Sequence, residues 1–96
     1  MISGLAVLRM NIEKIDEPIR VLASFAGGAC QPLRFRWGNR EYRVDAVNGR
    51  WIDRGPAGQS GGGYCLHYSV QVGNEAYYIH FSSAEVQWRL DQVVVT

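Results

Sequence analysis

Cysteine is scarce in this sequence, and long apolar runs are missing from it. The two cysteines, Cys30 and Cys65, are too few for a disulfide-rich secreted scaffold. Free thiols are typical of a reducing compartment. The longest apolar run near the start, residues 5–8, is far too short for a signal peptide or a membrane span. We therefore expect a cytoplasmic protein that has no membrane partner.

A dominant charge of either sign is also missing. Charged residues make up 20% of the 96 residues, and the formal net charge is +1. This balance argues against intrinsic disorder and against a strongly cationic polymer binder. Hydrophobic residues make up 47%, so one domain of this length can build a core without cross-links.

Catalytic and phosphate-binding motifs do not occur in the sequence. The signatures of serine hydrolases, zinc peptidases, P-loop proteins and dithiol oxidoreductases are all missing. Residues 55–63 contain five glycines, but the basic residue and the helix of a phosphate-binding loop do not follow them. We interpret this segment as a flexible loop between strands. We expect no enzymatic activity, no cofactor and no small-molecule substrate.

The pattern that is present is that of antiparallel β-hairpins. Apolar and charged residues alternate from Leu33 to Trp37, and alternation resumes after Gly38-Asn39. A two-residue Gly-Asn turn is a hairpin signal, and it fixes the register of the two strands. The register places Phe35 opposite Tyr42 on an apolar face. The other face is then charged, as expected for a sheet with one side in water.

A second hairpin follows the same logic. Residues 64–72 alternate in polarity, Gly73-Asn74 makes the turn, and another alternating run follows. The turn places Tyr68 opposite Ile79, so that apolar residues meet apolar residues along most of the pair. A slip of one residue would lose this match.

These hairpins predict an all-β fold for residues 18–96. We expect a single domain of five to six strands, arranged as a small antiparallel barrel or a strongly curled sheet. The first strand is expected over residues 19–25, and a bulge or bend is expected at Asn48-Gly49. Residues 1–17 show no strand alternation but have apolar residues at helical spacing, so we expect a leader that is a short helix or disordered.

The best candidate for a functional surface is an arginine-rich face. Residues 34–54 contain six arginines and three acids, a net charge of +3, whereas the rest of the chain has four cations and six acids. Small β-barrels that bind single strands combine arginines with stacking rings. A solvated sheet face with ion pairs would look the same in the sequence. The candidate residues for binding nucleic acid or a protein partner are Arg34, Arg36, Arg43, Arg50, Trp51 and Arg54.

A weaker candidate is a metal site on the second hairpin. Its register places His67 opposite His80, and Cys65 lies on the same face two residues from His67. Zinc accepts such ligands, but the sequence offers no evident fourth one. A polar outer face would also produce this pattern. We therefore expect no bound metal. Cys65, His67 and His80 are the only candidate metal ligands that the sequence suggests.

The chain also resembles a known but uncharacterised bacterial domain family over roughly residues 18–94. The resemblance rests on Pro18-Ile19-Arg20-Val21, on Pro32 followed by Phe35-x-Trp37-x-x-Arg40-x-Tyr42-x-Val44, on Trp51, and on Trp88-x-Leu90. Members of that family are small standalone proteins or C-terminal tails of Y-family-like DNA polymerase homologues of mutagenic repair. The resemblance implies a role with DNA or a DNA-repair protein, and it implies no catalytic residues.

Two functions of different classes follow from these observations. The first is a non-enzymatic accessory module that binds nucleic acid or a repair partner through the arginine-rich face. The second is a protein-interaction or structural domain whose arginines only solvate the sheet.

Overall fold

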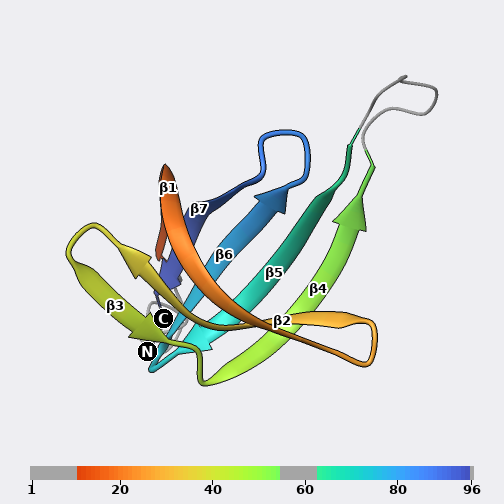
Figure 1. The fold of residues 1–96 in the computed structure, drawn as a ribbon. Helices are drawn as coiled ribbons and strands as arrows, with labels where there is room; N and C mark the ends of the chain where they lie inside the picture. Colours follow the sequence, from red (N-terminus) through yellow and green to blue (C-terminus); the bar gives the residue numbers. More distant parts are fainter. Residues whose placement is uncertain (1–10, 55–62, 96) are drawn as a thin grey trace, which may run out of the picture.

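The chain folds into one curled antiparallel sheet (Figure 1). The structure is a computed structural model and describes residues 11–54 and 63–95. Within those residues it has seven strands and no helix, in the order β3-β2-β1-β7-β6-β5-β4. The strands are β1 (Asn11–Ala26), β2 (Ala29–Trp37), β3 (Arg40–Arg43), β4 (Ala46–Asp53), β5 (Cys65–Val72), β6 (Glu75–Ser82) and β7 (Gln87–Val95).

Glycine conformation explains the tight turns. Gly38 and Gly73 have φ of +62° and +60°, as the first turn residue of a type II′ hairpin requires. The registers predicted from these turns are confirmed: Phe35 pairs with Tyr42, and Tyr68 pairs with Ile79. The bulge predicted near Asn48-Gly49 is also confirmed, because the pairing of β4 with β5 shifts between Val47 and Gly49.

The two hairpins supply most of the buried core. Phe35 is 1% exposed, and its ring stacks on Tyr42 at a centroid distance of 5.0 Å. Tyr77 packs against both rings, at 5.3 and 5.4 Å. The other buried core residues are Ile19, Tyr68, Val70, Ile79, Leu90 and Val93. Aromatic packing of this kind adds to the free energy of simple apolar burial.

The start of the first strand differs from the prediction. β1 begins at Asn11, so residues 11–17 belong to the sheet and are neither a helix nor a leader. Their strand pattern is hidden because the pairing of β1 with β7 shifts between Lys14 and Glu17, and Asp16 has a φ of +52°. Such a bulge breaks the alternation on which strand prediction depends. Residues 1–10 lie outside the described residues, as does most of the predicted glycine-rich loop.

The prediction of five to six strands is also wrong, because the run from Arg40 to Asp53 forms two strands at opposite edges of the sheet. The Val44 amide donates to the Leu33 carbonyl of β2 at 2.9 Å, whereas the next amide, Asp45, donates to Gln71 of β5 at 2.8 Å. This short link joins β3 to β4 and closes one end of the sheet. The other end stays open, and the sheet is therefore a half-barrel.

No helix among the described residues is long and apolar enough to cross a membrane.

Candidate nucleic-acid interface

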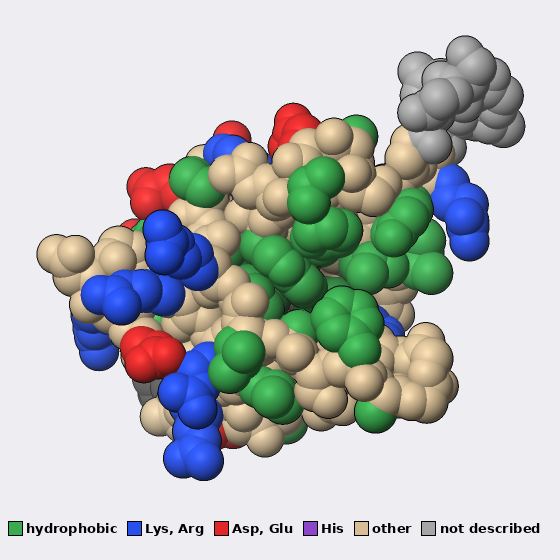
Figure 2. Space-filling view, in the orientation of Figure 1, with side chains coloured by type: hydrophobic (Ala, Val, Ile, Leu, Met, Phe, Trp, Pro, Cys, Tyr) green, Lys and Arg blue, Asp and Glu red, His purple; other side chains and the backbone are tan. Residues whose placement is uncertain are grey.

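The six residues predicted to bind nucleic acid or a partner fall into two groups. Both groups are exposed, but they belong to different strands of the half-barrel. Figure 2 shows basic side chains gathered toward the β2–β3 end and hydrophobic side chains over the middle of the same view. Arg34, Arg36 and Arg43 lie on the outer face of the β2–β3 hairpin, whereas Arg50, Trp51 and Arg54 lie on β4 or directly after it.

The first group is enlarged by an arginine from β1. Arg34 pairs with Arg43 and Arg36 with Glu41, while Arg20 of β1 lies opposite Arg36. Residues directly opposite each other project to the same face of a sheet. We call Arg20, Arg34, Arg36 and Arg43 the arginine patch. Arg34 Nη1 lies 3.5 Å from Glu41 Oε2, and these side chains are 53% and 57% exposed, so the ion pair is weak and the patch keeps a net positive charge.

The aromatic rings of the same hairpin point away from the arginine patch. Phe35 and Tyr42 stack in the core, and Trp37 contacts Tyr42 at a centroid distance of 6.1 Å. The Trp37 indole N–H also donates a 2.8 Å hydrogen bond to Glu17 Oε1. These rings therefore make their contacts within the protein. The arginine patch offers positive charge, but its own hairpin provides no ring on which a base could stack.

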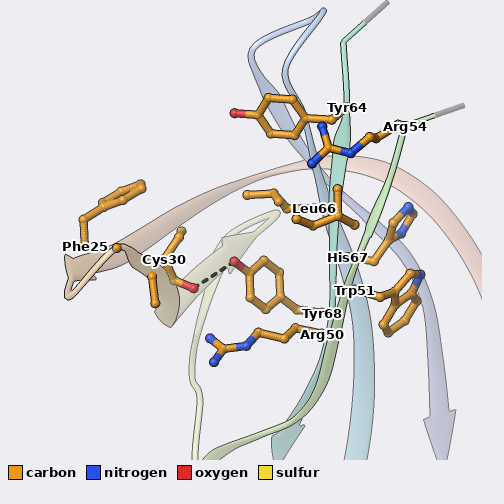
Figure 3. A pocket seen from close by; sticks show the side chains of 12 residues that line it. Phe25, Cys30, Arg50, Trp51, Arg54, Tyr64, Leu66, His67 and Tyr68 are labelled. Atoms are coloured by element: carbon orange, nitrogen blue, oxygen red, sulfur yellow. Dashed lines mark hydrogen bonds between the residues drawn. The ribbon is translucent and has the colours of Figure 1, made fainter. Parts of the chain in front are cut away.

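The second group lines a cleft at the open end of the half-barrel. The cleft has a volume of about 640 Å³ and lies between the β1–β2 hairpin and strands β4 and β5 (Figure 3). Three rings at its border are well exposed: Phe25 at 79%, Trp51 at 48% and Tyr64 at 42%. The lining residues are Phe25, Gly28, Ala29, Cys30, Arg50, Trp51, Ile52, Arg54, Tyr64, Leu66, His67 and Tyr68. We call this space the open-end cleft.

Two arginines enter the open-end cleft from β4. Arg50 lies opposite Tyr68, and both side chains point toward Cys30 in Figure 3, whereas Arg54 lies near Tyr64. Trp51 points to the other side of the β4–β5 pair, as strand alternation requires. Neither guanidinium forms a salt bridge within residues 11–54 and 63–95. Both can therefore contact an anionic ligand.

Tyr68 holds the floor of the open-end cleft in place. Its hydroxyl donates a 2.8 Å hydrogen bond to the backbone carbonyl of Cys30. Burial and the contact with Cys30 raise the pKa of Tyr68 to about 12, although nearby Arg50 acts in the opposite direction. Tyr68 is thus a neutral hydrogen-bond donor at physiological pH, and it links β5 to β2 across the gap.

The structure changes the set of candidate metal ligands. His67 and His80 do meet, with ring centroids 5.3 Å apart, as the hairpin register predicts. Cys65 pairs with Ser82 and does not join them. Asp91 of β7 takes its place: one ligand atom from each of His67, His80 and Asp91 lies within 4.8 Å of the others.

Sequence reasoning missed several residues of these surfaces. Phe25 and Tyr64 reach the open-end cleft because the sheet stays open, which is not encoded in any local pattern. Arg20 joins the arginine patch through the pairing of β1 with β2. A sequence signal existed only for Phe25, since it lies two residues before the Gly27-Gly28 turn and therefore near a hairpin tip.

Comparison with known proteins does not assign this chain to a family. The chain matches no protein-family model, no curated protein and no solved structure.

Proposed function

We propose that this chain is a non-enzymatic accessory module that binds single-stranded nucleic acid in the open-end cleft. One observation carries the proposal: Arg50 and Arg54 share that cleft with the exposed aromatic rings of Phe25 and Tyr64. Proteins that bind single strands without sequence preference combine a cationic groove with rings on which the bases stack. The cleft volume of about 640 Å³ is within the range of known ligand sites.

The roles of the residues follow from their positions. Phe25 and Tyr64 offer ring faces on which a base can stack, a contact worth about 1–3 kcal/mol per base. Arg50 and Arg54 provide guanidinium groups for phosphate oxygens. The arginine patch lies on a separate surface and adds long-range attraction, which salt weakens.

The sequence resemblance supports DNA as the nucleic acid. Proteins of the family that the chain resembles include tails of polymerase homologues in mutagenic repair. We accordingly place the module in a DNA-repair complex of the bacterial cytoplasm. Its partner there is a DNA strand, or a repair protein that presents one.

A second candidate function is the binding of an extended peptide. Among the described strands, β4 has a neighbour on one side only, and its other edge borders the open-end cleft. Exposed sheet edges bind peptides by adding a strand. The exposed apolar side chains of Phe25 and Ile52 would then contact the peptide instead of a base.

The test is a fluorescence-anisotropy titration of labelled oligonucleotides with the full chain, in single-stranded and duplex form, at low and high salt. We expect saturable binding that favours the single strand and weakens with salt. Tyr64→Ala should lower the affinity by roughly 1–3 kcal/mol, which is about fivefold or more. Absence of binding at low salt would reject nucleic acid and favour the peptide.

The matched control is a cation that lies away from both surfaces. Lys14 is exposed on β1 opposite Gln92 of β7, and Lys14→Ala removes the same charge as Arg50→Ala. We expect Arg50→Ala to weaken binding several-fold more than Lys14→Ala. Equal losses would mean that net charge alone attracts the oligonucleotide and that the open-end cleft does not bind it.

A further inference from the structure

A row of four side chains crosses strands β4 to β7. The Trp51 ring stacks on His67 with centroids 5.2 Å apart and planes 5° apart. His67 is followed by His80 at a centroid distance of 5.3 Å, and His80 Nδ1 lies 2.8 and 2.9 Å from the two carboxylate oxygens of Asp91. Trp51 and His67 lie on the side of the β4–β5 pair opposite Arg50 and Tyr68 (Figure 3).

Strand alternation places Asp91 on the face that carries His80. His80 pairs with Arg89, and Asp91 lies two residues further along β7, so both side chains leave the face opposite buried Leu90. Leu90 pairs with Ile79 and Gln92 with Tyr78, so the register shifts at Asp91, which has no partner of its own. The Asp91 carboxylate lies within 2.8 Å of His80 Nδ1.

We propose that His67, His80 and Asp91 bind one divalent transition-metal ion, with zinc as the best fit. Two imidazoles and one carboxylate are a donor set that zinc accepts, and three protein ligands leave a position for water. Ligand atoms about 2.1 Å from one ion lie roughly 3.3 Å apart, so a shift on the order of 1 Å within the 4.8 Å cluster completes the site. The side chains of His80 and Asp91 are 17% and 34% exposed, which leaves the ion a path from solvent.

Binding of a metal ion to these residues requires a rearrangement of protons on His80. Without metal, His80 Nδ1 lies 2.8 Å from Asp91 Oδ1, and in the tautomer that has its proton on Nδ1 the imidazole donates to the carboxylate. Metal binding requires a neutral histidine with a free lone pair and an ionised carboxylate. If the ion binds His80 at Nδ1, the neutral imidazole carries its single proton on Nε2 instead, a change of tautomer that exchanges through solvent, and no electron transfer is involved.

The charges around the cluster are compatible with a cation. Arg89 lies opposite His80 in the strand pairing and would repel a metal if its guanidinium turned toward the site. Instead, Arg89 donates to the Asp16 carboxylate at 3.1 Å and to the Asp16 carbonyl at 2.8 Å. Asp16 thus holds the nearest cation away and partly neutralises it.

The experiment is calorimetric titration of the full, untagged chain with zinc chloride, in its reduced form. We expect saturable binding of one ion per chain. His80→Gln and Asp91→Asn should each weaken binding by about tenfold or more, since even the outer partners of metal ligands contribute that much. Asp91→Asn is the sharper variant because an amide oxygen can still accept from His80 while the carboxylate charge is lost.

The controls are Cys30→Ser and Cys65→Ser, because free thiols also bind zinc. We expect both variants to bind one ion as the unmodified chain does. Loss of binding in Cys65→Ser with no effect of Asp91→Asn would overturn the proposal, as would the lack of any saturable binding. Circular dichroism of each variant shows that the fold is kept.

A second readout locates the ion and does not depend on the affinity of zinc. Co²⁺ quenches the fluorescence of a nearby indole, and Trp51 stacks directly on His67. We expect Co²⁺ to quench the chain, and Trp51→Phe to remove this quenching while one ion still binds by calorimetry. Quenching that persists in Trp51→Phe would place the ion elsewhere and refute this site. This site is separate from the proposed nucleic-acid function, which Arg50→Ala tests.

Discussion

The hydroxyl of Tyr68 donates a 2.8 Å hydrogen bond to the backbone carbonyl of Cys30, which lies 38 positions earlier in the chain. This bond joins β5 to the β1–β2 hairpin across the side of the half-barrel that no strand closes. At the other end, the chain itself connects the two edges of the sheet, because Val44 and Asp45 join β3 to β4. The shape of the open-end cleft therefore depends on a single tyrosine at one end and on the chain itself at the other.

Tyr68→Phe should destabilise the protein by about 1 kcal/mol. The variant keeps the buried ring and loses one hydrogen bond, whose net contribution is of that order. Urea unfolding followed by circular dichroism measures the difference. Tyr78→Phe is the control, because Tyr78 is half-buried on β6 and its hydroxyl has no such role at the cleft. Equal stability of Tyr68→Phe and the unmodified chain would contradict this role of the hydroxyl.

The stability should also fall at alkaline pH in a way that depends on Tyr68. The folded-state pKa of Tyr68 is raised from 10.0 to about 12, chiefly by burial. A raised pKa contributes stability that is fully present below the unfolded pKa and is lost as the pH rises through the folded one. We expect the difference in unfolding free energy between the unmodified chain and Tyr68→Phe to shrink between pH 10 and pH 12. A difference that stays constant over this range would contradict the cause given for the shift.

The hairpin turns make a separate prediction about glycine. Gly38→Ala and Gly73→Ala place a side chain where φ is about +60°, which costs roughly 1–2 kcal/mol each. Gly49→Ala is the matched control, since its φ lies outside the left-handed region and an added Cβ would meet no atom within 4 Å. Thermal unfolding of the three variants should show a large loss for the first two only. A comparable loss in Gly49→Ala would contradict φ as the cause, since reduced freedom of the unfolded chain would by itself stabilise the fold.

Local turn chemistry explains how much of the fold could be predicted. A Gly-Asn turn sets the register of its own hairpin, so the pairs Phe35–Tyr42 and Tyr68–Ile79 follow from neighbouring residues alone. The start of β1 could not be found in this way, because Asp16 sits in a bulge whose conformation depends on pairing with β7.

Long-range pairing limits what could be predicted about the sites. His67 and His80 belong to one hairpin and were found, whereas Asp91 reaches them through the pairing of β6 with β7. The open-end cleft depends on where the half-barrel stops closing, and Phe25 and Tyr64 therefore carried no usable signal of their joint position. Arg50 and Arg54 were found because their residue type, and not their geometry, suggested nucleic-acid binding, whereas the ring of Trp51 points away from the cleft.

The arginine patch should affect the binding of nucleic acid differently from the open-end cleft. Arg34→Ala with Arg43→Ala removes two positive charges from a surface without stacking rings, so affinity should fall at low salt and change little at high salt. Arg50→Ala with Arg54→Ala should lower the affinity at both salt concentrations, and reduce the slope of log affinity against log salt by about 0.7 for each lost phosphate contact. Anisotropy titrations over a salt series measure both. Identical salt profiles for the two double variants would contradict separate roles.

The most direct test of the central claim, that bases stack in the open-end cleft, is ¹⁹F NMR of the chain labelled with fluorotyrosine. The five tyrosines give five resonances, and Tyr64→Phe assigns the one from the border of the cleft. Addition of a short oligothymidine should shift the Tyr64 resonance to saturation and leave the resonances of Tyr42 and Tyr77, which pack in the core, in place. An unchanged Tyr64 resonance at an oligonucleotide concentration that saturates the anisotropy signal would contradict stacking at this site.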